Sequence, residues 1–213
     1  MTVDSCLFDA CQRDRVPVLR IYSWTPAAFS LGVNQNPEDI IDLRLCRKEG
    51  IGVVKRMTGG EAIFHDDELT YSVVAPLEDL GCGTSVKKSY KRICGCIINA
   101  YKRVGLSADF SCDSMHEFAG RQPLCFASRQ EYDIIIAGKK IGGNAQKRSR
   151  DVILQHGSIP FTFDIEKIKR YLRADITDML RCSAPLCAHT EDGDIREKIK
   201  NALIEAFADK FPI

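Results

Sequence analysis

The sequence contains no run of about 18 apolar residues, so it predicts no transmembrane helix. Its start, MTVDSCLFDACQRDR, does not place basic residues before an apolar core, which argues against a secretory signal. A formal net charge of +1 gives no general attraction to nucleic acid or to an anionic membrane surface. We therefore expect a cytoplasmic protein without a nucleic-acid or membrane partner, whose binding sites are local.

Internal repeats, low-complexity tracts and linkers rich in Pro, Gly and Ser are also missing. The 213 residues, 45% hydrophobic and 28% charged, suffice for one substantial core. Strand-like and helix-like segments follow one another along the chain. We predict an α/β fold, with a mixed β-sheet and flanking helices, in a single domain over residues 1–213. No exposed apolar stripe suggests a partner subunit, so we expect a monomer.

Cysteine is abundant, but its pattern predicts neither disulfides nor a metal site. Ten cysteines in a small secreted chain would suggest a disulfide framework, whereas the length and the missing signal favour free thiols here. The close pairs Cys94/Cys96 and Cys182/Cys187, the second near His189, lack the CxxC spacing of a zinc module. We therefore expect no metal and no cofactor.

Periodicity and capping residues predict the other elements. Helices are expected over residues 1–12, 36–50, 84–104, 164–172 and 194–211. Strands are expected over residues 16–24, 28–32, 51–54, 69–74, 131–137, 140–146 and 152–159, with 140–146 pairing back on 131–137 as a hairpin. Residues 106–122 have no clear period and are interpreted as a surface loop.

Polar residues are concentrated between the predicted strands 51–54 and 69–74. This glycine loop reads Arg56-Met-Thr-Gly-Gly-Glu-Ala-Ile-Phe-His-Asp66. Gly59-Gly60 allows close approach of a ligand, and its backbone N–H groups can face a carbonyl or a phosphate. Two glycines alone fit a plain hairpin turn equally well. The density of polar groups in a half-buried segment favours a loop that binds a ligand.

Three ordered segments resemble the biotin/lipoate protein ligase and acyltransferase superfamily. The glycine loop resembles its signature loop. Gly138-Lys-Lys-Ile-Gly-Gly-Asn-Ala-Gln146 resembles the segment with the catalytic lysine, which maps onto Lys140, and Leu154-Gln-His-Gly-Ser-Ile159 resembles the strand that follows it. Residues 1–4, 19–24 and 30–32 are similar to the family's opening, so the resemblance covers nearly the whole chain and implies a biotin/lipoate ligase-type catalytic domain.

Within the superfamily, the chain most resembles the cysteine-dependent octanoyltransferases of lipoate biosynthesis. His65-Asp-Asp-Glu-Leu-Thr-Tyr-Ser72 is similar to the transferases rather than the ligases, and Cys125 stands fifteen residues before Lys140, where these transferases carry their nucleophile. The resemblance implies transfer of an octanoyl group from acyl carrier protein to a lysine of a lipoyl domain or of glycine-cleavage H protein. Two alternatives stay open. One is an ATP-dependent lipoate ligase domain that has lost its accessory domain or works with a separate accessory subunit. The other is a non-catalytic acyl-protein binding module.

The implied chemistry assigns roles to particular residues. Thioester exchange needs a thiolate, and a nearby lysine ammonium lowers the pKa of a cysteine. Cys125 and Lys140 are therefore the expected catalytic pair, with Lys140 accepting a proton or placing the acyl carbonyl. Backbone N–H groups at Gly59-Gly60 or Gly142-Gly143 could form an oxyanion hole. The expected substrate-binding residues are Arg56, Thr58, Gly59, Gly60, Ala62, Phe64, His65, Tyr71, Gly142, Gly143, Asn144 and Ala145.

Further expectations concern the walls of this site. Ile63, Phe64 and Ile141 are expected to line a tunnel for an eight-carbon chain. His65 could orient the glycine loop or shuttle protons, and His156 is interpreted as structural. Glu61 stands where the family usually has Gly or Arg, which leaves room for an unusual substrate.

Overall fold

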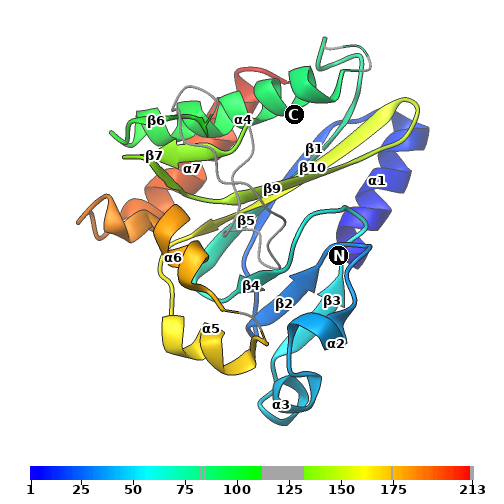
Figure 1. The fold of residues 1–213 in the computed structure, drawn as a ribbon. Helices are drawn as coiled ribbons and strands as arrows, with labels where there is room; N and C mark the ends of the chain where they lie inside the picture. The colour runs from blue at the N-terminus through cyan, green and yellow to red at the C-terminus, as the bar shows by residue number, and fades with distance from the viewer. Residues whose placement is uncertain (82, 84, 112–131, 174, 212–213) are drawn as a thin grey trace.

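The computed structural model describes residues 1–81, 83, 85–111, 132–173 and 175–211 (Figure 1). Its helices are α1 (Thr2–Asp14), α2 (Pro37–Ile40), α3 (Leu43–Lys48), α4 (Val86–Arg103), α5 (Ile165–Tyr171), α6 (Thr177–Cys182) and α7 (Ile195–Ala208), with a 3-10 helix at Leu186–Ala188. Its strands are β1 (Val18–Tyr22), β2 (Ala28–Leu31), β3 (Gly52–Lys55), β4 (Ile63–His65), β5 (Glu68–Pro76), β6 (Ala108–Phe110), β7 (Ile134–Ile136), β8 (Lys139–Lys140), β9 (Gly143–Arg148) and β10 (Val152–Pro160).

The strands form three sheets in the described part of the chain. An antiparallel sheet has the order β1-β5-β10-β9. A second sheet, β3-β2-β4, is mixed, because β2 runs parallel to β3 and antiparallel to β4. A third, β6-β7-β8, is antiparallel. The predicted α/β class with a mixed sheet and flanking helices is confirmed.

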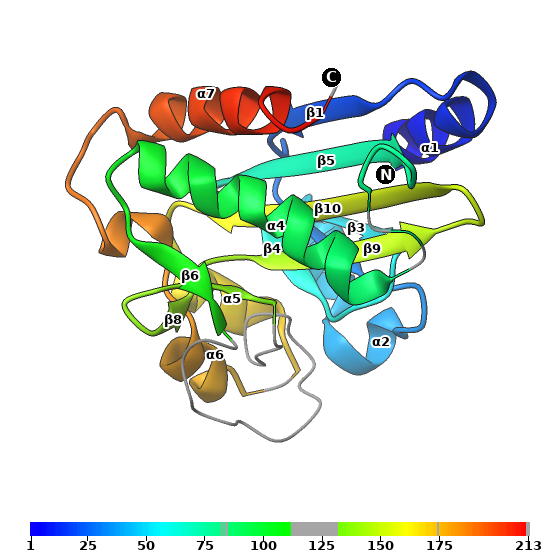
Figure 2. The same cartoon turned by 90° about the horizontal axis from the view of Figure 1, so that it is seen from above.

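The centre of the fold is the pair β5 and β10, in which all nine residues of each strand are buried. Helices α4 and α7 cover one face of their sheet, and the β3-β2-β4 sheet lies on the opposite side (Figures 1 and 2). Because side chains alternate along a strand, Leu69, Tyr71 and Val73 pack into the core under the helices. The other face of β5 carries Glu68, Thr70 and Ser72, so a buried polar surface lies between the two sheets.

Capping side chains explain where several helices begin. The Asp164 carboxylate accepts from the Lys167 backbone N–H at 3.0 Å, as predicted, and the Ser85 hydroxyl accepts from Lys88 N–H at the start of α4. The predicted helix over 36–50 is wrong in one respect: it is split into α2 and α3. Ile41 between them is extended and bridges Leu172, and Asp42 caps the new helix.

The chain between Ala137 and Gly143 also differs from the prediction. Ala137 and Gly138 both have positive φ, 48° and 74°, and form the tight turn between β7 and β8. The predicted hairpin is only two residue pairs long, because the chain from Gly143 onward leaves this sheet and joins β10. The predicted surface loop 106–122 contains β6 in its described part, which pairs with β7.

The plain-hairpin interpretation of the glycine loop is wrong. Strands β3 and β5 belong to different sheets, and β4 forms within the loop itself. The loop therefore crosses from one sheet to the other. No helix in the described ranges combines the length and the apolar character needed to cross a membrane.

Candidate active site

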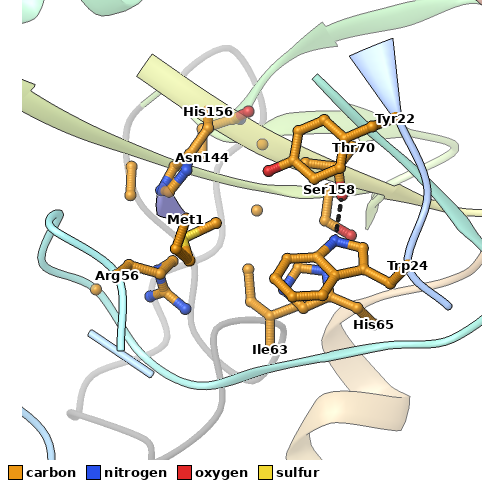
Figure 3. Close-up of a pocket in the computed structure, with 14 residues that line it drawn as sticks. Met1, Tyr22, Trp24, Arg56, Ile63, His65, Thr70, Asn144, His156 and Ser158 are labelled. Atoms are coloured by element: carbon orange, nitrogen blue, oxygen red, sulfur yellow. Dashed lines mark hydrogen bonds between the residues drawn. The ribbon is translucent and has the colours of Figure 1, made fainter. Parts of the chain in front are cut away.

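A cavity lies between the β1-β5-β10-β9 sheet and the β3-β2-β4 sheet, where the glycine loop crosses from one to the other (Figure 3). It encloses about 360 Å³ of empty space, part of which opens to solvent. Its walls come from segments far apart in the sequence: Met1, Tyr22 and Trp24; Arg56, Gly60, Ile63 and His65 of the glycine loop; Thr70 of β5; Gly143, Asn144 and Ala145 of β9; and His156, Gly157 and Ser158 of β10.

Arg56 holds the glycine loop in its path. Its side chain is buried, and its guanidinium donates to the Ser30 carbonyl at 2.6 Å and the Ser30 hydroxyl at 2.9 Å. It also donates to the Glu61 carbonyl at 2.8 Å and the Gly59 carbonyl at 3.2 Å. These bonds join Ser30 of β2 to the carbonyls on either side of Gly60. Several N–H donors of Arg56 therefore bind groups of the protein itself.

Two glycines allow the loop to lie against β2. Gly60 has a φ of 89°, a conformation that favours glycine. A Cβ on Gly32 would lie 1.9 Å from the Gly60 carbonyl oxygen, so only glycine permits this approach. The backbone at Gly60 thus lies against Gly32. Gly60 lines the cavity, and a Cβ added at Gly59 would meet no atom within 4 Å, so close approach of a ligand to this pair stays a prediction.

Thr58 joins the loop to β10 through His156. The Thr58 hydroxyl and His156 Nε2 are 2.8 Å apart, and His156 Nδ1 lies 3.9 Å from the carboxylate of Asp4 in α1. Burial lowers the pKa of His156, although the nearby Asp4 carboxylate works in the opposite direction. His156 is one of the residues that line the cavity, and its support by a carboxylate of the first helix was not predicted from the sequence.

His65 is hydrogen-bonded through Nε2, and its Nδ1 lies beside a carboxylate without a hydrogen bond. Nε2 is 2.6 Å from the Ser30 hydroxyl, and Nδ1 is 2.8 Å from a carboxylate oxygen of Glu68. The ring stacks on Trp24, with 4.2 Å between centroids and 15° between planes. Since both nitrogens face protein groups, the geometry favours the orienting role for His65 over proton transfer to a ligand.

The segment after Lys140 packs closely against β10. A Cβ on Gly142 would lie 2.4 Å from the Ser158 carbonyl oxygen. Gly157 leaves room for Tyr71 and Asn144, whose side chains meet across it: the Tyr71 hydroxyl donates to Asn144 Oδ1 at 2.6 Å, and Gln155 Nε2 donates to Tyr71 at 2.8 Å. Asn144, Gly143 and Ala145 line the cavity, whereas Tyr71 lies behind it in the core.

Eight expected residues in the described part of the chain do not line this cavity: Thr58, Gly59, Ala62, Phe64, Tyr71, Lys140, Ile141 and Gly142. Phe64 points to the other side of β4, where its ring lies 4.6 Å from that of Phe29. Ala62 is fully buried in the same cluster as Phe29. Ile141 is fully buried in the core under α4 and α7. Of the three residues expected to line a tunnel, Ile63 alone lines this cavity.

Lys140 is buried and ion-paired. Its side chain is 2% exposed, and Nζ lies 2.8 Å from a carboxylate oxygen of Asp133. Its backbone carbonyl accepts from Ala184 N–H at 3.0 Å, which fixes β8 against the segment after α6. Lys140 is not among the cavity-lining residues. Cys125, its predicted catalytic partner, lies outside the described residues.

Glu68 was missed as a site residue by sequence reasoning. It lies behind the cavity wall, 5% exposed, and its carboxylate accepts from the hydroxyls of Thr70 and Ser158. The signal in the sequence was its place in β5, where it alternates with apolar residues on a strand buried on both faces. Among the described residues, no group of three or more His, Cys, Asp or Glu side chains is arranged to hold a metal ion.

Comparisons with known proteins place this geometry in a family. The model of the lipoyl protein ligase A/B catalytic domain matches residues 1–208. The chain is 37% identical to an octanoyltransferase LipM of Oceanobacillus iheyensis over 169 residues, 79% of this chain and 61% of that relative. It is 32% identical to an octanoyltransferase LipM of Clostridioides difficile over 225 residues, 100% of this chain and 82% of that relative.

A solved structure supports the fold. The bipartite lipoate protein ligase studied with its E2 lipoyl domain from Thermoplasma acidophilum superposes with a TM-score of 0.74 over 97% of this chain and 76% of that one, at 23% identity. At that identity the likeness shows the fold alone. The chain spans less than two thirds of the length of several relatives it matches, 61% for the Oceanobacillus protein. The match over residues 1–208 shows that the chain belongs to the lipoyl protein ligase A/B catalytic domain family.

Proposed function

We propose that the protein is an octanoyltransferase, which moves an octanoyl group from acyl carrier protein to a lysine of a lipoyl domain or of glycine-cleavage H protein. The observation that carries this proposal is the 32% identity to the Clostridioides difficile octanoyltransferase, which extends over the whole of this chain and over 82% of that relative. Membership of the catalytic-domain family supports it.

The lining of the cavity is compatible with an acyl chain. Each methylene that an acyl chain buries in it would contribute about 0.8 kcal/mol. Ile63, Trp24 and Met1 give apolar contact surface, and Gly60 and Gly143 present backbone at the same cavity.

The proposed chemistry runs through two thioesters. The Cys125 thiolate attacks the carbonyl carbon of the octanoyl-carrier thioester, and the carrier thiol leaves and takes up a proton. The amine of the acceptor lysine then attacks the Cys125 thioester. An amide forms, the Cys125 thiol leaves, and the amine gives up one proton. One thioester replaces another in the first step, and the second step ends in an amide, so no ATP is consumed.

Lys140 has a proposed role as a buried ammonium. Asp133 at 2.8 Å is a counter-ion, and a carboxylate at this distance favours the charged form of a lysine. A charged Lys140 cannot accept the proton of the acceptor amine. The ion pair therefore favours the second of the two predicted roles, in which Lys140 stabilises negative charge on the thiolate or on the acyl oxygen.

The proposal covers residues 1–213 as one catalytic domain that acts in the cytoplasm as a monomer, with no metal or cofactor.

The second candidate function is the ATP-dependent lipoate ligase domain. It is favoured by one observation: the structure superposed on this chain is a bipartite ligase, so this fold also serves ligation in a protein that shares it.

One experiment separates the two functions. The purified protein is incubated with octanoyl-acyl carrier protein and an apo lipoyl domain, with and without ATP, and in parallel with free lipoate and ATP. The mass of the lipoyl domain is then measured. We expect it to gain one octanoyl group from the carrier without ATP. Modification that occurs only with ATP and a free acid would identify a ligase and refute the proposal.

A further inference from the structure

Two residues with aliphatic hydroxyl groups line the cavity that is proposed to hold an alkyl chain. Thr70 and Ser158 face each other across β5 and β10 and both line the cavity. A hydroxyl hydrogen that pointed into this space would lose its partner when an alkyl chain displaced water from it. The direction of these hydrogens therefore bears on which ligand the cavity accepts.

The carboxylate of Glu68 takes up both hydrogens. Thr70 Oγ1 donates to Glu68 Oε1, and Ser158 Oγ donates to Glu68 Oε2. Thr70 in turn accepts from the indole N–H of Trp24 at 2.9 Å, the bond drawn in Figure 3. The hydroxyls of Thr70 and Ser158 are thus both bonded to a protein group.

Glu68 also lies close to His65, another polar residue of this wall. His65 Nδ1 lies 2.8 Å from Glu68 Oε1 without making a hydrogen bond to it, and Glu68 itself is 5% exposed and absent from the cavity surface. A buried carboxylate is costly unless several donors meet it. Here hydroxyl donors from β5 and β10 converge on one carboxylate immediately behind the cavity wall.

We propose that Glu68 is a specificity-determining residue: it draws the hydroxyl hydrogens of Thr70 and Ser158 away from the cavity, so that the wall offered to the ligand accepts an unbranched alkyl chain. This inference rests on the proposed function, because it takes the cavity as the acyl site. It assigns to Glu68 a role in acyl binding, and no contact with the reacting atoms.

Replacing one carboxylate oxygen by an amide tests this role. Glu68→Gln keeps the shape of the side chain, but its amide nitrogen cannot accept a hydrogen bond. One hydroxyl must then turn its hydrogen elsewhere, and the cavity is the open direction. We expect octanoate to bind about tenfold more weakly, within the range that one unsatisfied buried donor produces. Glu68→Asp, which keeps the charge with a shorter reach, should lie between the wild type and the Gln variant.

The binding assay has a built-in probe. Trp24 is the single tryptophan of the chain and lines the cavity, so tryptophan fluorescence during titration with octanoate reports on this space directly. The double variant Glu68→Gln/Ser158→Ala removes the hydroxyl that Gln cannot satisfy, and should recover most of the lost affinity. A general loosening of the fold would not be reversed by this second change.

Asp67→Asn is the matched control. It also removes one carboxylate charge, one position earlier, from a side chain that bonds Arg196 and Thr162 away from the cavity. We expect its octanoate affinity to equal that of the wild type. Unchanged affinity in Glu68→Gln, or a loss that Ser158→Ala does not reverse, would overturn the inference.

The wild type separates this inference from the proposed function. If it transfers octanoyl groups but Trp24 does not respond to octanoate, the cavity is not the acyl site, and the inference alone is overturned. If it binds octanoate with the expected effects of Glu68→Gln but transfers nothing, the proposed function fails and the assignment of Glu68 as an acyl-specificity residue stands.

Discussion

Replacing Asp4 by Asn should destabilise the protein in a way that depends on pH. Asp4 is 1% exposed, and its carboxylate accepts from Arg20 at 2.8 Å and from the Tyr22 hydroxyl at 3.2 Å. Burial raises the pKa of this carboxyl, but the hydrogen bonds with His156 and Arg20 and the charges of both outweigh burial, and lower it from 3.8 to about 2.

The pKa shift sets the size of the effect and the pH range. A shift of a little under two units, at about 1.4 kcal/mol each, corresponds to about 2.5 kcal/mol of stability. Because the pKa is lower in the folded state, this contribution is fully present above pH 4. It is lost as the pH falls through about 2, where the folded protein also binds the proton.

Urea denaturation of the wild type and of Asp4→Asn at stepped pH values measures this contribution. At pH 7 we expect the variant to be less stable by about 2.5 kcal/mol, and the difference to shrink as the pH falls from 4 towards 2. Asp9→Asn, on the exposed side of the same helix, is the control and should match the wild type. Equal stability of Asp4→Asn and wild type at pH 7, or a difference that stays constant down to the lowest pH at which both fold, would refute the reasoning.

Two other substitutions test the loop and the buried ion pair. Gly32→Ala places a Cβ 1.9 Å from the Gly60 carbonyl oxygen and forces the glycine loop off β2. The free energy of unfolding, measured by urea denaturation, should fall by about 1–3 kcal/mol, and kcat/KM for octanoyl transfer should also fall. Unchanged values would show that the contact is not needed. Lys140→Met leaves the Asp133 carboxylate buried without this ammonium, so the free energy of unfolding should fall by about 3 kcal/mol and transfer should drop at least about 100-fold; a variant of full stability and activity would contradict the assigned ion pair.

Some of this fold could be predicted from local sequence signals. The apolar, β-branched run in 69–74 and the cap at Asp164 each depend on neighbouring residues, and both β5 and α5 are where the sequence predicts them. The split of the predicted helix at Ile41 could not be predicted, because it depends on a bridge to Leu172, more than a hundred residues away.

Other misses come from which face of an element turns inward. In α1, Val3, Leu7 and Cys11 are spaced by four residues, a pattern that predicts a shared buried face. In the structure, however, Val3 is 49% exposed and Asp4 is buried. Arg20 of β1 and His156 of β10 lie against the Asp4 carboxylate and hold it inward, and these contacts are not visible in the periodicity of the helix. Phe64 was expected in the cavity because β4 was not recognised as a strand, so its alternation could not be used.

In the candidate site, too, some residues could be predicted from local motifs and others depend on contacts between distant segments. The motifs indicated Arg56, Thr58, His65 and Asn144, and the structure brings their segments around one cavity. Glu68 is different, because its role depends on the register that sets Ser158 opposite Thr70. A strand register of this kind is not visible in one sequence, since the partner strand lies about 90 residues further along the chain.

The formation of a thioester on Cys125 is the measurement that tests octanoyl transfer most directly. The wild type is mixed with octanoyl-acyl carrier protein in the absence of ATP and of any acceptor, quenched in acid, and examined by intact-protein and peptide mass spectrometry. We predict one octanoyl group on the peptide that contains Cys125, its loss on addition of an apo lipoyl domain, and no adduct in Cys125→Ser. Transfer to the lipoyl domain at the wild-type rate by Cys125→Ser would contradict the account.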